Sequence, residues 1–232
     1  MKHPSKILGV LGGMGPAATA EFMRLMFELA PAGFDQEHPK MIVYNHTVTP
    51  DRTAHILGGG SDPMPALKYG IDKLVAWGAD VLAVPCNTAH YYLDQIHSEI
   101  SIPLIHIIEE TVRRAQELSP EGAWITSTLG TAKTGLYQKH SALMGYSFRY
   151  ATTSEQEIIH GIIKLVKAGE TKKAGERYRE VIKKLWDREN LPIVGACTEL
   201  PIAYRYTGLE ESRFISSLES LARGTIKYLY EL

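Results

Sequence analysis

The chain has two cysteines, and both follow an apolar run that we expect to be a strand. Cys86 follows "VLAVP" and Cys197 follows "LPIVGA". Each precedes a threonine, Thr88 or Thr198, where we expect a helix to begin. The amino terminus of a helix stabilises a thiolate, so a cysteine placed there can exchange a proton. A single such cysteine more often packs as a small apolar side chain, but two matched positions favour acid–base chemistry.

Two other chemistries of cysteine and histidine have less support. The cysteines lack CxxC spacing, so neither has an obvious resolving partner for thiol exchange. Two cysteines without a disulfide framework favour a reducing cytoplasm. The nine histidines include no HExxH motif. We therefore expect His90, His97 and His106 to be packed or on the surface, and we expect no metal site.

A glycine-rich loop, "GGMGPAA", follows the first apolar run. From Gly13 to Ala18 it fits the relaxed GxGxxA form of a dinucleotide fingerprint. That fingerprint also needs an acidic residue after the second strand, and Asn45 and His46 stand there instead. The loop is therefore interpreted as a place where a small ligand approaches the backbone closely.

Apolar runs alternate with amphipathic segments along most of the chain, which predicts an α/β fold with mainly parallel sheets. We expect strands at residues 6–11, 40–45, 80–85, 102–107, 122–128, 146–153 and 191–197. We expect helices at residues 16–29, 66–78, 131–144, 154–168 and 170–188.

The helix expected from Ser154 carries the clearest signals. Ser154 and Glu157 have the spacing of a capping box, and Gly169 is placed to end the helix. Its predicted apolar face consists of Ile158, Ile159, Ile162, Ile163 and Val166.

The spacing of the motifs predicts two lobes. In each half a strand leads into a glycine-containing loop, "GVLGGMGP" or "ITSTLGT", and a strand ending in cysteine follows about 70 residues later. We expect one lobe at residues 1–112, completed by a C-terminal helix at 208–232, and a second lobe at 113–207. Ligands of parallel sheets bind beyond the carboxyl ends of the strands, where both cysteines are expected.

Composition excludes several classes of partner. Lys and Arg number 25 against 26 Asp and Glu, without a run of like charge, so we expect no nucleic acid or anionic membrane as partner. The apolar runs are shorter than the roughly 20 residues of a membrane helix. The amino terminus lacks a cleavage pattern, so we interpret its apolar run as a buried strand and not as a secretory signal.

Several blocks together resemble the aspartate racemase branch of the aspartate/glutamate racemase family. They span about residue 7 to about residue 203 and include "GVLGGMGPAATAEF", "HPKMIVYNHTVTPDRTAHILG", "VPCNTAH", "GTAKTGLYQK" and "GACTEL". The resemblance implies two pseudo-symmetric three-layer α/β lobes with an active-site cleft between them. It also implies a cytoplasmic homodimer that racemises an acidic amino acid, aspartate above all, without pyridoxal phosphate or another cofactor.

The resemblance assigns a role to each candidate residue. Cys86 and Cys197 would exchange the α-proton on opposite faces of the substrate. Arg52 and Lys167, otherwise interpreted as a turn arginine and a helix-end lysine, would hold the side-chain carboxylate. The other expected substrate-binding residues are Met14, Asn87, Thr88, Thr131, Thr198 and Glu199.

Two departures from the pattern of relatives bear on specificity. Glutamate racemases have a loop resembling DSGxGG and a second motif GCTHYP, and here Glu199 replaces that histidine, which favours the aspartate branch. Ser216 and Ser217 stand where many relatives carry Asp-Pro or Asp-Thr. The alternatives are a glutamate or broad-specificity racemase, a non-catalytic amino-acid binding protein and a thiol-redox protein.

Overall fold

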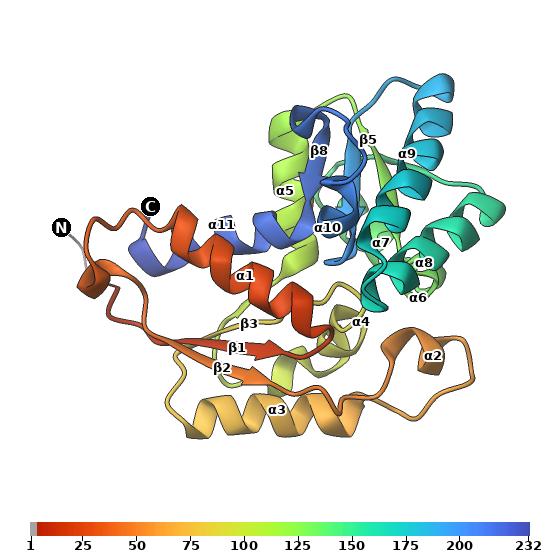
Figure 1. Ribbon diagram of the computed structural model, residues 1–232. Helices are drawn as coiled ribbons and strands as arrows, with labels where there is room; N and C mark the ends of the chain where they lie inside the picture. Colours follow the sequence, from red (N-terminus) through yellow and green to blue (C-terminus); the bar gives the residue numbers. More distant parts are fainter. Residues whose placement is uncertain (1–3) are drawn as a thin grey trace. The chain divides into compact units, whose positions relative to one another are not determined.

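The computed structural model describes residues 4–232, which form two compact units (Figure 1). One unit contains the described residues up to Ile107 together with Leu218–Leu232, and the other is Ile108–Ser217. From the sequence, the boundaries were predicted after residues 112 and 207, and the predicted first lobe included residues 1–3, which lie outside the described residues. The predicted fold class, α/β with two lobes and parallel sheets, is confirmed.

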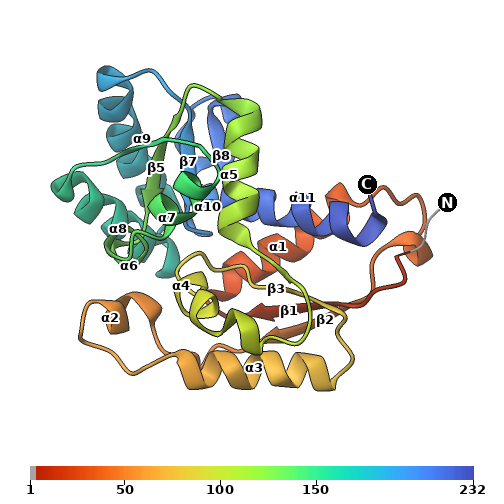
Figure 2. The same ribbon diagram turned by 180° about the vertical axis from the view of Figure 1, so that it is seen from behind.

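The first unit is built on a parallel sheet with the strand order β2-β1-β3-β4. Its strands are β1 (Leu8–Gly12), β2 (Met41–Asn45), β3 (Val81–Ala83) and β4 (Leu104–Ile105). Helices α1 (Pro16–Leu29) and α11 (Ser217–Tyr230) lie on one face of the sheet and α3 (Met64–Ala76) on the other (Figures 1 and 2). Shorter elements are η1 (Asp35–Glu37), α2 (Arg52–Ile56), α4 (His90–Leu93) and η2 (Asp94–Glu99).

Local sequence explains the first strand and helix. All residues of β1 are buried, as expected for a parallel strand with helices on both faces. Pro16 occupies the first turn of α1, where its missing N–H costs no hydrogen bond. The helix buries Ala18, Phe22, Leu25 and Met26, whose spacing of four, three and one residues places them on one face.

The second unit repeats this plan with the strand order β6-β5-β7-β8. Its strands are β5 (Ala123–Ser127), β6 (Phe148–Tyr150), β7 (Ile193–Ala196) and β8 (Phe214–Ser216). Helices α8 (Thr153–Lys167) and α9 (Thr171–Arg188) lie on one side of the sheet and α5 (Ile107–Leu118) on the other (Figures 1 and 2). The remaining elements are α6 (Leu129–Lys133), α7 (Leu136–Leu143), α10 (Leu200–Tyr204) and η3 (Glu211–Arg213).

Helix α8 begins earlier than its sequence predicted. Thr152 is the N-cap, and it forms the capping box with Glu155, so the assignment of Ser154 and Glu157 was wrong. Ile158 is 44% exposed and does not belong to the buried face that its neighbours form. Gly169 follows the helix with a φ of +82°, which confirms its predicted role as the terminating residue.

Strand β8 was not predicted from the sequence. It has three residues, which are too few to show a strand period. Among the described strands it pairs only with β7.

Packing explains why the neighbouring strand, β7, contains a glycine. A Cβ atom on Gly195 would lie 2.3 Å from the ring of Phe214, so only glycine leaves room for that side chain.

The two sheets share one order, in which β1 corresponds to β5 and β3 to β7. Cys86 comes shortly after β3, and Cys197 comes directly after β7. The internal repeat predicted from motif spacing is therefore present in the strand order. No helix within residues 4–232 is long and apolar enough to cross a membrane.

Candidate active site

The loop after β1 is held in a tight conformation by Thr19 of α1. Gly13 has a φ of +90°, and a Cβ atom there would lie 2.5 Å from the carbonyl carbon of His46. The amide of Gly13 donates to Thr19 Oγ1 over 2.9 Å, and that hydroxyl donates to the carbonyl of Gly15 over 3.1 Å. Glycine is therefore required at position 13, where the loop after β1 closely approaches the backbone that follows β2.

Arg52 connects this loop to the segment that follows β2. Its Nη2 donates to the carbonyl of Met14 over 3.0 Å. Its Nη1 donates to the carbonyls of Pro50 and Thr49 over 3.0 and 3.3 Å. Arg52 is 7% exposed, so it is not the solvated turn arginine that its local sequence would suggest.

One edge of the Arg52 guanidinium lacks a hydrogen-bond partner within the described part of the chain. Its Nε is buried and has no hydrogen-bond partner among residues 4–232. Leaving a buried donor without an acceptor costs about 1–3 kcal/mol, and more for a charged group. A carboxylate fits such a donor well, because guanidinium and carboxylate form charge-assisted hydrogen bonds in matching planar geometry.

Cys86 is 5% exposed and belongs to the apolar cluster that also includes Met14. Asn87 and Thr88, which follow it, are buried as well. The amide of His90 donates to the carbonyl of Asn87 over 3.0 Å, and α4 begins at His90. Thr88 therefore lies in the turn before the helix, and the expectation that a helix begins at Thr88 was wrong.

His90 holds the backbone of Cys86 from inside the protein. Its ring is fully buried, and its Nδ1 lies 2.9 Å from the carbonyl oxygen of Cys86. Since a carbonyl only accepts, this contact assigns the proton to Nδ1. The Nε2 atom then accepts from the amide of Ile107 over 3.4 Å. His90 is thus fixed as one neutral tautomer between the Cys86 loop and the start of α5.

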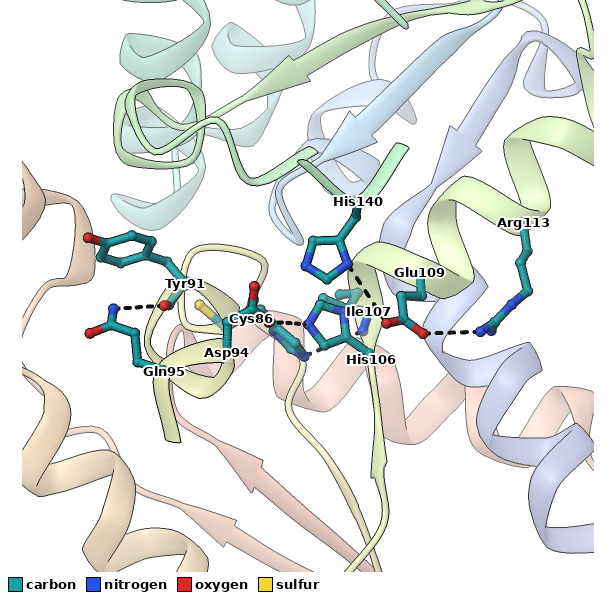
Figure 3. A network of polar contacts seen from close by, with 10 residues as sticks. Cys86, Tyr91, Asp94, Gln95, His106, Ile107, Glu109, Arg113 and His140 are labelled. Carbon is teal, nitrogen blue, oxygen red and sulfur yellow. Dashed lines mark hydrogen bonds and ion pairs between the residues drawn. The ribbon is translucent and has the colours of Figure 1, made fainter. Parts of the chain in front are cut away.

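A second histidine packs against His90 and pairs with an aspartate. The ring of His106 packs edge-on against His90, with 4.5 Å between the ring centroids. His106 Nε2 lies 3.0 Å from Asp94 Oδ1 (Figure 3). From the sequence both histidines were expected to be packed or on the surface, and the contact of His90 with the Cys86 carbonyl was not predicted. The spacing of four residues between Cys86 and His90 was the available signal.

Tyr92 of α4 connects the Cys86 loop to the Arg52 segment. Its hydroxyl donates to the carbonyl of Arg52 over 3.3 Å and lies 2.8 Å from His55 Nδ1. Burial raises the pKa of Tyr92 to about 12, so it stays a neutral phenol at ordinary pH. The predicted site residues of the first unit therefore belong to the segments that follow β1, β2 and β3: Met14, Cys86, Asn87 and Thr88 lie in loops or turns, and Arg52 is the first residue of α2.

Cys197 in the second unit is 5% exposed and lies next to a buried carboxylate. Its Sγ donates to Glu199 Oε2 over 3.0 Å, and the hydroxyl of Thr198 donates to the same oxygen over 3.3 Å. Burial raises the pKa of Cys197 well above that of an ordinary thiol, and the charge of Glu199 adds to this effect. The positive charge of Lys167 opposes it. Cys197 is therefore a thiol in the unliganded protein.

Glu199 is 3% exposed, and its second oxygen, Oε1, has no hydrogen-bond partner among residues 4–232. The sequence singled out Glu199 because it replaces a histidine of other racemases, but it did not predict the contact with the thiol. Lys167 is the last residue of α8, and its side chain is exposed although its charge acts on Cys197.

Thr131 and the serine pair complete the second unit's carboxyl edge. Thr131 lies in the short helix α6, which ends before α7, where the sequence predicted one helix over residues 131–144. The N-cap side chain of Thr128 accepts from the amide of Thr131 over 3.0 Å. Ser217 is fully buried, and its side chain forms a hydrogen bond with Tyr137. At the position where the sequence departs from the Asp-Pro or Asp-Thr pair, Ser217 thus provides a hydrogen-bond partner for the buried Tyr137 hydroxyl.

Comparisons with known proteins agree with this arrangement. The model of the Asp/Glu/Hydantoin racemase family matches residues 11–223. The broad specificity amino-acid racemase RacX of Bacillus subtilis (strain 168) is 26% identical over 224 residues, which cover 95% of this chain and 96% of the relative.

Solved structures give the same result. An aspartate racemase of Picrophilus torridus superposes with a TM-score of 0.84 and 28% identity, over 97% of this chain and 94% of that chain. A glutamate racemase of Bacillus anthracis, isoform RacE1, has a TM-score of 0.68 and 17% identity, over 99% of this chain and 83% of that chain, which shows the shared fold.

The chain belongs to the Asp/Glu/Hydantoin racemase family, as its sequence motifs suggested, and it is a cofactor-independent racemase, an isomerase with an amino acid as substrate.

Proposed function

We propose that this racemase inverts the α-carbon of an acidic amino acid, aspartate in the first place, by passing a proton through Cys86 and Cys197. The observation that carries the proposal is the equivalence of the two thiols. Each follows the corresponding strand of its unit, β3 or β7, and each is buried at the carboxyl end of a parallel sheet. Ligands bind at that end of such sheets.

Inversion needs a base on one face of the α-carbon and an acid on the other. In the proposed reaction the Cα–H bond breaks as one cysteine thiolate takes the proton. The other cysteine gives its S–H proton to the opposite face of the carbanion, and a new Cα–H bond forms. The two cysteines exchange roles for the other enantiomer. The hydrogen bond from Cys197 to Glu199 supports a thiol, and hence an acid, at that position.

The carbanion needs stabilisation because no pyridoxal ring is used as an electron sink. Backbone N–H groups that point at the α-carboxylate can stabilise the charge that develops there. Asn87, Thr88 and Thr198 follow the two cysteines and are the proposed donors. All three residues are buried, so solvent would screen their hydrogen bonds to a substrate only slightly.

We propose that Arg52 selects acidic substrates by binding the side-chain carboxylate, with Lys167 as a second positive charge. The buried Nε of Arg52 without a partner supports this role. Met14, Thr131 and Glu199 are the further proposed contacts. Aspartate and glutamate differ by one methylene, which is worth only about 1–3 kcal/mol of discrimination. Glutamate or broader specificity is therefore the alternative that the experiment must separate.

The proposed enzyme works as a homodimer in a reducing compartment, the cytoplasm. Both cysteines are free thiols, and the mechanism requires that they stay reduced. Sedimentation or light scattering tests the oligomeric state, and a monomer at working concentration would contradict that part of the proposal.

The function is tested by incubating the protein with L-aspartate, L-glutamate and L-alanine without pyridoxal phosphate and separating the products by chiral chromatography. We expect D-aspartate to form fastest and D-alanine slowest. A faster reaction with glutamate would instead indicate a glutamate racemase, and equal rates with all three would indicate a broad-specificity racemase. Binding of aspartate without any D-product would indicate a non-catalytic binding protein.

A further inference from the structure

We propose that Glu199 holds Cys197 in its protonated form in the free enzyme, so that the resting form is ready for the direction of reaction in which Cys197 is the proton donor and Cys86 is the base. This inference rests on the proposed two-cysteine reaction and adds a positioning residue to it. Glu199 acts through Cys197 and determines which of the two cysteines carries the proton before substrate binds.

The geometry defines a thiol–carboxylate pair. Cys197 Sγ lies 3.0 Å from Glu199 Oε2, and a carboxylate accepts hydrogen bonds, so the hydrogen belongs to the sulfur. The hydroxyl of Thr198 donates to the same oxygen over 3.3 Å and fixes the orientation of the carboxylate. Both members of the pair are buried, so solvent screens their interaction little.

Charges around the thiol favour the same state. Glu199 contributes a negative charge two residues from the sulfur, and Lys167 at the end of α8 contributes a positive charge that opposes it. Tyr178 of α9 and Tyr137 of α7 also face Cys197, and burial raises the pKa of both, so they stay neutral. Burial and Glu199 together outweigh Lys167, and the pKa of Cys197 is raised.

A two-base racemase works only when one cysteine is protonated and the other is not. If both thiols held the proton equally well, the free enzyme would divide between two singly protonated forms. Glu199 makes the form with the proton on Cys197 dominant. After turnover that leaves Cys197 deprotonated and Cys86 protonated, Cys86 loses its proton to water and Cys197 takes one up, which restores the starting state.

The pair also determines how the reaction responds to alkaline pH. The active form disappears when Cys197 loses its proton, so a raised pKa extends activity to higher pH. Replacing Glu199 by glutamine removes the negative charge and makes loss of the proton easier. The alkaline limb of the kcat/KM profile should then move to lower pH, by about one unit or more for a charge at this distance.

Alkylation measures the thiol directly. In a Cys86→Ala background the rate of reaction with iodoacetamide against pH reports the deprotonation of Cys197. We expect a midpoint above the ordinary thiol value of about 8.5. With Glu199→Gln added, the midpoint should fall by about one unit, so that alkylation well below the midpoint is about tenfold faster. Glu199→Asp keeps the charge and should restore most of the difference.

Glu170→Gln is the matched control, because it removes an exposed carboxylate of the same unit that pairs with Lys173 over 2.8 Å. This control should leave the alkylation midpoint and the kcat/KM profile unchanged.

The inference is overturned if Cys197 alkylates with a midpoint at or below about 8.5, a result that needs no Glu199 variant. It is also overturned if Glu199→Gln leaves both the midpoint and the alkaline limb unchanged. These outcomes are distinct from failure of the proposed function, which would show as absence of racemisation by the wild-type protein while the alkylation profile still reports on the thiol–carboxylate pair.

Discussion

Arg52 Nη2 donates to the carbonyl oxygen of Met14 over 3.0 Å, and this contact joins two segments 38 residues apart in the sequence. The glycine-rich loop and the segment that begins α2 are therefore held together by a buried guanidinium. Nε still lacks a partner within residues 4–232, and it is the atom proposed above to bind the substrate's side-chain carboxylate.

The first prediction separates these two roles of Arg52. Arg52→Ala should lower the free energy of unfolding by about 1–3 kcal/mol, because it leaves buried carbonyls without donors. It should also lower the preference for aspartate over alanine, measured as the ratio of their kcat/KM values, by at least about tenfold, which corresponds to loss of one charge-assisted hydrogen bond. Arg52→Lys keeps the charge but not the planar fork, so it should recover only part of the preference. An unchanged ratio in Arg52→Ala would remove Arg52 from substrate recognition.

The second prediction concerns the two thiols. Cys86→Ala and Cys197→Ala should each lower kcat for racemisation by about 10²–10⁴-fold, the usual contribution of a positioned acid or base. Circular dichroism of the product mixture follows the reaction, and thermal unfolding of each variant checks that the fold is retained. Wild-type rates in either variant would exclude that cysteine from proton transfer.

The third prediction tests how His90 positions Cys86. His90→Phe removes the donor to the Cys86 carbonyl and the acceptor of the Ile107 amide, so kcat should fall at least about tenfold with little change in KM. His90→Asn can restore the donor at the Nδ1 position and should recover part of kcat. A purely structural role predicts instead that stability falls while kcat per folded molecule stays the same. His97→Asn, at an exposed histidine of the same unit, is the control that should change neither.

The fourth prediction concerns the close approach at Gly13. Gly13 and Gly78 have similar φ angles, +90° and +93°, so alanine at either position pays a similar conformational cost of about 1–2 kcal/mol. At Gly13 the new Cβ atom would also lie 2.5 Å from the backbone of His46, whereas at Gly78 nothing lies within 4 Å. Urea denaturation should therefore show a clearly larger loss of stability for Gly13→Ala than for Gly78→Ala. Equal losses would mean that the loop can move away without cost.

Helices and strands with clear local sequence signals were predicted, although not all of their bounds were correct. Helix α1 has the predicted range, 16–29, because Pro16 marks its start and an apolar face repeats with the helical period. Helix α8 was predicted with a late start, because Thr152 and Ser154 both fit the N-cap position and only the backbone distinguishes them. Strand β8 has too few residues for a detectable period.

The candidate residues could be named from the sequence, but their contacts could not. Cys86 and Cys197 were found from strand and loop patterns. Each follows a predicted strand, and β3 and β7 hold the same position in their sheets. The contact of Arg52 with Met14 could not be predicted, since it depends on how loops far apart in sequence meet. Glu199 is only two residues from Cys197, but whether it faces the thiol depends on the turn before α10.

The central claim, transfer of the α-proton by two different thiols, is tested most directly by racemising L-aspartate in deuterated water and stopping below about 5% conversion. Mass spectrometry after chiral separation then measures deuterium in each enantiomer. The two-thiol reaction predicts that nearly all newly formed D-aspartate carries one α-deuterium, while the remaining L-aspartate carries almost none. Comparable deuterium in both enantiomers, or D-aspartate that keeps the original proton, would contradict the account.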